Sequence, residues 1–150
     1  MSAQTDMVTD TSRPTESRPG RAELRDELSA RVREEHGGYL ERLAVRVVPP
    51  RSARGVVVVS IGRHAARHAG GECLGRQQER RELTRLLLRV CTDLSTAQGM
   101  RGVPRAMGWL SEVVVLRRMA RALRSAEHLS HDEVAELLDI SPATVAKLLG

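Results

Sequence analysis

The last 21 residues, SHDEVAELLDISPATVAKLLG, place side chains that can bind DNA at helical spacing. Ser141 and Thr144 could bond base edges or phosphate oxygens, and Lys147 suits a phosphate or a guanine edge. Two alanines between them would allow close approach and contact with a thymine methyl group. The expected DNA-contacting face therefore consists of Ser141, Pro142, Ala143, Thr144, Ala146 and Lys147.

These side chains need two short helices to position them. Ser130 followed three residues later by Glu133 is a capping-box pattern, which predicts a helix start there. The small Ala135 would let two helices cross closely. Asp139 occupies a turn position that requires left-handed backbone, which Asp adopts at modest cost. The first helix would bury Val134, Leu137 and Leu138.

The second helix has its own start signals. Ser141 is a capping residue, and Pro142 suits the first helical position. Ile140 would fill the core after the turn, and the inward side chains would be Val145 and Leu148. Residues 130–150 thus predict a helix-turn-helix, whose second helix enters the DNA major groove.

The motif itself is short of positive charge. The chain has a formal net charge of +5, but residues 129–150 hold Lys147 against four acids. Arginines just upstream could supply the contacts to the DNA backbone that the motif lacks. The expected contributors are Arg117, Arg118 and Arg121.

The segment LSHDEVAELLDISPATVAKLL resembles the promoter −35-reading helix-turn-helix of bacterial sigma factors of the extracytoplasmic-function group. EVVVLRR, residues 112–118, is similar to the helix that precedes it in that family. LRDELSARVREEHGGYLERLAVRVV, residues 24–48, resembles the start of the family's polymerase-binding domain. The resemblance implies double-stranded DNA, the RNA polymerase core and an anti-sigma protein as partners, and a role in transcription regulation.

Two alternatives remain open. The run ELLDISPATVAKLL also resembles the excisionase-type helix-turn-helix of small regulators and some antitoxins. In the sigma family, aromatic residues help to open promoter DNA, and residues 51–75 contain none, so that activity carries over to no residue here. A degenerate, sigma-like interaction module without melting activity is the second alternative.

Other chemistry has weaker support in the sequence. His64 and His68 are four residues apart, as metal ligands on one helix face are, and Cys73 and Cys91 could be considered with them. No CxxC pair or acidic third ligand accompanies them, and no catalytic constellation or phosphate-loop pattern occurs. We therefore expect no metal, no cofactor and no enzymatic activity.

The chain has 150 residues, no Phe and very few other aromatics, which favours a mostly α fold of one or more small helical bundles. We expect a disordered leader over 1–20, a helical segment over 21–48 in two parts divided at His36-Gly37-Gly38, and an uncertain linker over 49–75. Within that linker GVVVVSIG is of strand type, although a loop or a buried helix would also fit.

A helical domain is expected over 76–150, with helices at 76–95 and about 105–127 ahead of the closing motif. The later of these two helices should bury Leu110, Val113, Val114, Leu116, Ala120 and Leu123. No apolar stretch approaches membrane-spanning length, and no signal peptide is visible, so we expect a cytoplasmic protein without membrane contact.

Overall fold

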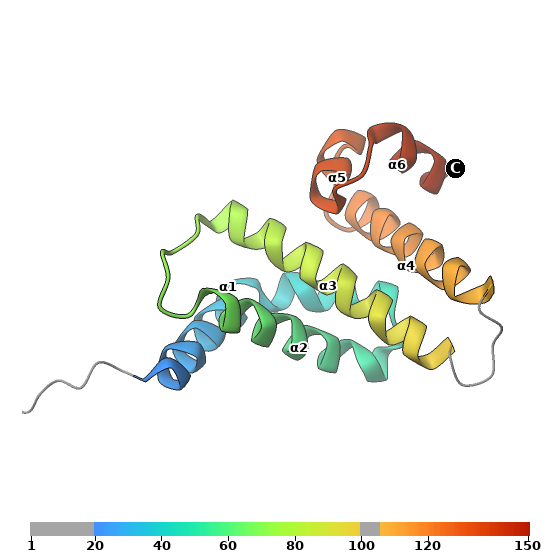
Figure 1. Cartoon of the computed structure of the whole chain (residues 1–150). Helices are drawn as coiled ribbons and strands as arrows, with labels where there is room; N and C mark the ends of the chain where they lie inside the picture. Colours follow the sequence, from blue (N-terminus) through green and yellow to red (C-terminus); the bar gives the residue numbers. More distant parts are fainter. Residues whose placement is uncertain (1–19, 100–105) are drawn as a thin grey trace, which may run out of the picture.

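A computed structural model describes residues 20–99 and 106–150, and within these ranges the chain forms six helices and no strand. They are α1 (Arg21–Val47), α2 (Pro50–His68), α3 (Arg76–Gly99), α4 (Ala106–Ser125), α5 (His131–Leu138) and α6 (Pro142–Leu149). The first three lie against one another, α4 runs along α3, and the last two fold over one end of α4 (Figure 1). The mostly α fold class is confirmed. Of the expected leader, all but Gly20 lies outside the described residues.

Helix α1 is continuous, so the expected division at residues 36–38 is wrong. Two glycines in a helix interior lower its stability, but contacts on both sides of the pair hold this helix together. Before them Val32 is buried, and after them the Tyr39 hydroxyl lies 2.8 Å from the Thr84 hydroxyl of α3. Tertiary packing therefore outweighs the local preference.

Helix α2 contains the GVVVVSIG run, so the strand reading of that run is wrong. Its buried positions recur with helical period, whereas Val58 and Val59 are exposed. The Ser60 hydroxyl donates to the Val56 carbonyl at 2.8 Å, as serine does inside helices. Most of the expected linker is thus a core helix packed against α1 and α3, and only residues 69–75 connect α2 to α3.

Helices α3 and α4 match their expected positions, but the buried face of α4 differs in part from the prediction. On α3, Leu83, Leu86, Leu87 and Val90 are buried, and Leu94 is half-buried. On α4, Val114 is exposed and its neighbour Val115 is buried, because the helix presents to α1 and α3 a face offset by about one residue. Ala120 and Leu123 are buried, and Val113 and Leu116 are half-buried. The side chain of Leu110 lies outside the described residues.

One hydrophobic core contains residues from all six helices. Val134 of α5 and Val145 of α6 belong to the same cluster as Leu40 of α1 and Leu87 of α3. The closing helix pair therefore folds as part of the whole and not as an appendage. None of the helices in the described ranges is both long and apolar enough to cross a membrane.

Candidate nucleic-acid interface

The start and end of α5 have the geometry that the sequence predicts. The Glu133 amide donates to the Ser130 hydroxyl at 3.1 Å, and the Ser130 amide donates to the Glu133 carboxylate at 3.3 Å. Asp139 ends the helix in left-handed backbone, with φ 56 and ψ 47. The Ile140 amide then donates to the Ala135 carbonyl at 3.0 Å, so the turn leaves few helix-end groups without a partner.

Helix α6 begins immediately after this turn and separates apolar from polar side chains. The Thr144 amide donates to the Ser141 hydroxyl at 3.1 Å, and Pro142 occupies the first turn. Val145 and Leu148 are buried, and Ala135 of α5 is buried beside them in the same core. The expected DNA-contacting residues point the other way: Ser141, Pro142, Ala143, Ala146 and Lys147 are exposed.

Thr144 differs from its neighbours on this face. It is half-buried, and its hydroxyl lies 2.7 Å from the hydroxyl of Ser141. This contact fixes the position of the Thr144 oxygen, which can still accept a bond from a base or donate one to a phosphate. The two hydroxyls therefore form one hydrogen-bonding group at the start of α6.

The three expected arginines of α4 are not equivalent. Arg117 and Arg121 are exposed. Arg118 donates through Nη1 to the Val47 carbonyl at 3.2 Å, at the end of α1. That bond ties α4 to α1, so Arg118 has a structural partner, and the other two are better placed to contact phosphates.

Two arginines of α3, which the sequence analysis did not select, contact α5. Arg81 forms an ion pair with Glu136 at 2.8 Å. Arg85 donates through Nη2 to the Glu136 carbonyl at 2.8 Å and through Nε to the Leu137 carbonyl at 3.2 Å. They neutralise one acid of the closing motif and cap the negative end of α5. The sequence signal for these contacts is the spacing of Arg81 and Arg85, four residues apart, which places both on one exposed face of the helix.

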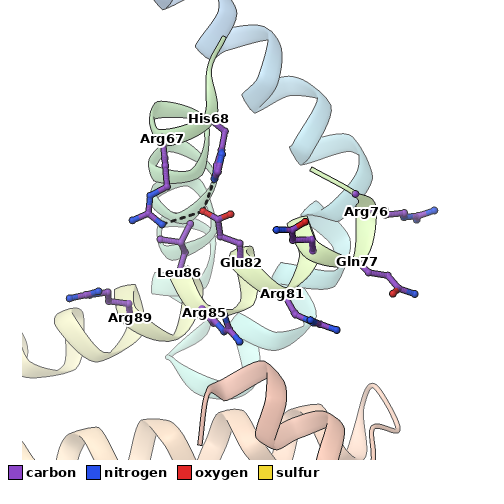
Figure 2. Close-up of a pocket in the computed structure, with 11 residues that line it drawn as sticks. Arg67, His68, Arg76, Gln77, Arg81, Glu82, Arg85, Leu86 and Arg89 are labelled. Atoms are coloured by element: carbon purple, nitrogen blue, oxygen red, sulfur yellow. Dashed lines mark hydrogen bonds and ion pairs between the residues drawn. The ribbon is translucent and has the colours of Figure 1, made fainter. Parts of the chain in front are cut away.

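The same two arginines form part of a basic cleft of about 1020 Å³ between α2 and α3 (Figure 2). Its lining includes Arg67, Arg76, Arg81, Arg85 and Arg89. Guanidinium groups bind phosphate oxygens well, and several around a concave surface concentrate positive potential. Arg81 and Arg85 line the cleft and also contact α5, so the cleft borders the closing helix pair.

Comparison with known proteins adds no family to this geometry. The chain matches no protein-family model, no curated protein and no solved structure. The assignment of the interface therefore rests on the residues described above.

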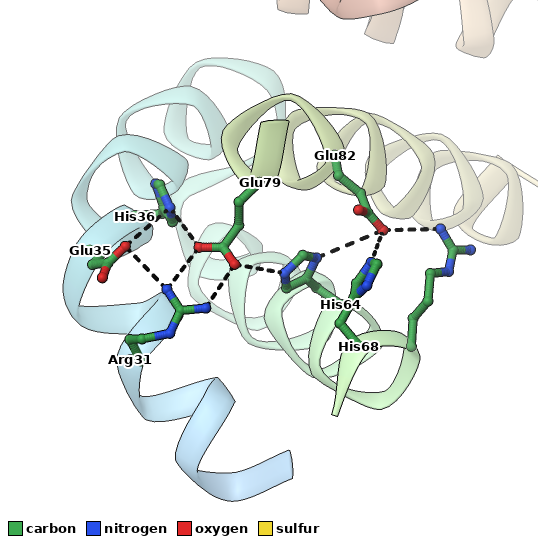
Figure 3. A network of polar contacts seen from close by, with 8 residues as sticks. Arg31, Glu35, His36, His64, His68, Glu79 and Glu82 are labelled. Atoms are coloured by element: carbon green, nitrogen blue, oxygen red, sulfur yellow. Dashed lines mark hydrogen bonds and ion pairs between the residues drawn. The ribbon is translucent and has the colours of Figure 1, made fainter. Parts of the chain in front are cut away.

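A buried polar network, which the sequence does not predict, joins α1, α2 and α3 (Figure 3). Glu79 of α3 is 2% exposed and receives two bonds from Arg31 of α1, at 3.1 and 2.9 Å. His36 Nε2 lies 3.0 Å away from one of its oxygens and His64 Nε2 3.3 Å from the other. Burial alone would raise the pKa of Glu79, but the bonds from Arg31 and His64 hold that pKa below its ordinary value.

Proposed function

We propose that this chain binds duplex DNA through the outer face of α6, as a sigma-factor-like reader of promoter DNA. The observation that carries the proposal is the separation of side chains on α6. Val145 and Leu148 fix the helix to the core while Ser141, Ala143, Ala146 and Lys147 face outward. That is how a recognition helix presents its residues to the major groove.

Charge outside the motif supports the same proposal. Phosphate contacts provide most of the sequence-independent affinity for DNA. Arg117 and Arg121 on α4 are exposed, and Arg81 offsets the charge of Glu136 on α5. The net negative charge of the closing motif is thus partly neutralised by its neighbours, and the arginines can add phosphate contacts beside the recognition helix.

The resemblance of residues 24–48 to the polymerase-binding domain gives the proposal a second partner. The exposed side of α1 would contact the RNA polymerase core, and an anti-sigma protein would compete for that side. A protein that binds the polymerase core would act in the cytoplasm. An excisionase-type regulator, the alternative, would bind its operator without polymerase. Co-purification with core polymerase supports the sigma-like form, and autonomous operator binding supports the alternative.

Fluorescence anisotropy with a panel of promoter duplexes over a range of salt tests the DNA contact. We expect Lys147→Ala to reduce the slope of log affinity against log salt by about one unit, because one phosphate contact is lost. Thr144→Ala should cost about 1–3 kcal/mol on the preferred sequence and less on others. Arg25→Ala, an exposed change near the start of α1 and far from α6, is the matched control.

Two results would overturn the proposal. One is the absence of binding at about 50 mM salt, where phosphate contacts are strong. The other is equal affinity for every duplex, unchanged by Lys147→Ala and Thr144→Ala, because the outer face of α6 would then make no contact with bases.

A further inference from the structure

Three side chains of metal-ligand type meet where the end of α2 packs against α3 (Figure 3). His68 Nε2 lies 2.7 Å from Glu82 Oε1, and His64 Nδ1 lies 3.8 Å from the same oxygen. All three ligand atoms are within 4.8 Å of one another. Around a tetrahedral ion with bonds of about 2.0–2.2 Å, ligand atoms lie roughly 3–4 Å apart, so small side-chain movements complete the geometry. His68 Nε2 donates to Glu82 in the metal-free chain, so binding an ion also releases that proton or moves it to His68 Nδ1.

The orientation of His64 is the most informative part of this cluster. Its ring is fully buried, and its Nε2 faces the Glu79 carboxylate at 3.3 Å. Because a carboxylate accepts hydrogen bonds, Nε2 carries the proton and Nδ1 carries the lone pair. That Nδ1 is buried without a hydrogen-bond partner among the described residues, and it points toward Glu82.

A carboxylate that fixes the tautomer of a histidine is the usual support for a metal ligand. Glu79 is itself held by Arg31 and by His36, so the support is rigid. A buried nitrogen lone pair without a partner is otherwise costly to a folded protein.

We propose that His64 Nδ1, His68 Nε2 and a Glu82 oxygen bind one divalent transition-metal ion. Two imidazoles and one carboxylate suit Zn²⁺ best, with the histidines one helical turn apart on α2. The sequence alone predicts no metal, because the third ligand lies on another helix, 14 residues from His68. The cysteines considered there take no part: neither Cys73 nor Cys91 belongs to the cluster within the described residues.

The ion would keep one position open toward the arginine cleft. His68 and Glu82 both line that cleft, whereas His64 closes the site from inside. Arg67 donates to Glu82 at 3.2 Å but has an exposed side chain, so it can turn into solvent when an ion arrives. Three protein ligands with an open fourth position leave room for water or for an anion attracted by the arginines.

A neighbouring cluster of Glu35, His36 and Glu79 also contains a buried histidine with an unpartnered Nδ1 among the described residues, but it differs in its charge. Arg31 donates to both oxygens of Glu79 and also to Glu35, at 3.3 Å. Its guanidinium already supplies the positive charge at that position. The metal is therefore assigned to the cluster beside the cleft and not to this one.

The test uses the full chain, stripped of metal with a chelator, and Zn²⁺ followed by calorimetry. We expect one Zn²⁺ per chain, and the loss of that binding in His68→Gln and in Glu82→Gln. Both positions are only partly buried, so these variants should fold, which circular dichroism checks. Glu79→Gln should weaken binding by about 10–100-fold, because it removes the support of His64 and not a ligand. His131→Gln, an exposed change on α5, is the matched control.

Co²⁺ gives an independent measurement of the ligand set. Visible absorption bands of tetrahedral or five-coordinate Co²⁺, without a thiolate charge-transfer band, would support two nitrogens and an oxygen. The proposal is overturned if the wild-type chain binds no Zn²⁺, if His68→Gln binds it as tightly as wild type, or if Cys73→Ser abolishes binding. None of these results depends on DNA binding.

Discussion

At the scale of single residues, Glu79 connects three helices through one carboxylate. Arg31 and His36 of α1 and His64 of α2 all contact it. Glu79→Gln removes the negative charge and replaces one acceptor oxygen with an amide NH2, which cannot accept the bonds that Arg31 and a histidine donate there. We expect the free energy of unfolding to fall by about 3 kcal/mol, the low end for a broken buried pair, because Arg31 keeps contact with water.

Urea denaturation in the presence of a chelator measures this loss without any contribution from metal. Glu35→Gln is the control, since Glu35 is exposed and also contacts Arg31. It should change the free energy by less than about 1 kcal/mol. Equal effects of the two substitutions would mean that the buried network contributes no more than a surface ion pair.

The sequence indicates that these polar groups are buried, but it does not identify their partners. Glu79 lies four residues before Leu83, His64 three after Ile61, and His36 four before Leu40, so each is on the apolar face of its helix. A charged or polar group on such a face predicts a buried partner. Which partner it meets depends on how α1, α2 and α3 pack, and helical periodicity does not specify that arrangement.

At the scale of elements, the local signals were sufficient where neighbouring residues decide the structure. The capping box at Ser130, the cap at Ser141 and the left-handed turn at Asp139 involve contacts within four residues, and all three are confirmed. Helix α2 could not be predicted in the same way. Four consecutive valines favour a strand by propensity, but Val56 and Val57 are both buried while the next two valines are exposed, a pattern that suits a helix packed against α1 and α3 and not an alternating strand.

The turn between α5 and α6 provides a test of backbone strain. Asp139 has φ 56, where alanine is disfavoured and glycine is not. Asp139→Ala should lower the free energy of unfolding by about 1 kcal/mol, and Asp139→Gly should change it by less. Thermal and urea unfolding measure both. An equal loss for alanine and glycine would instead assign the effect to the aspartate side chain.

The glycines of α1 offer a change in the opposite direction. A methyl group at Gly38 would meet only Arg42 Nη1, at 3.6 Å, the far end of a flexible side chain. Gly38→Ala should therefore raise the free energy of unfolding by about 0.5–1 kcal/mol. Gly70, with φ +80, is the contrasting position, where alanine should destabilise. Destabilisation by Gly38→Ala would show that the helix needs flexibility there.

At the scale of the whole molecule, the two cysteines report on opening of the core. Cys91 is fully buried, and burial raises the pKa of its thiol to about 12, so it holds almost no reactive thiolate at neutral pH. Cys73 is exposed. A thiol reagent should modify one cysteine per native chain quickly and both only after unfolding. Cys73→Ser should remove the fast reaction, and two equally fast thiols would contradict a continuous core.

That core also limits how recombination could exchange the closing helix pair, α5 and α6. Val134 and Val145 pack in a cluster with residues of α1 to α4, and Arg85 of α3 bonds the carbonyls at the end of α5. A recombination breakpoint between α3 and α4 would separate the pair from the arginine that completes it. Helices α5 and α6 therefore could not be exchanged as a unit without the helices that they pack against. New target preferences would arise through substitutions on the outer face of α6, because the inner face packs against α4 and α5.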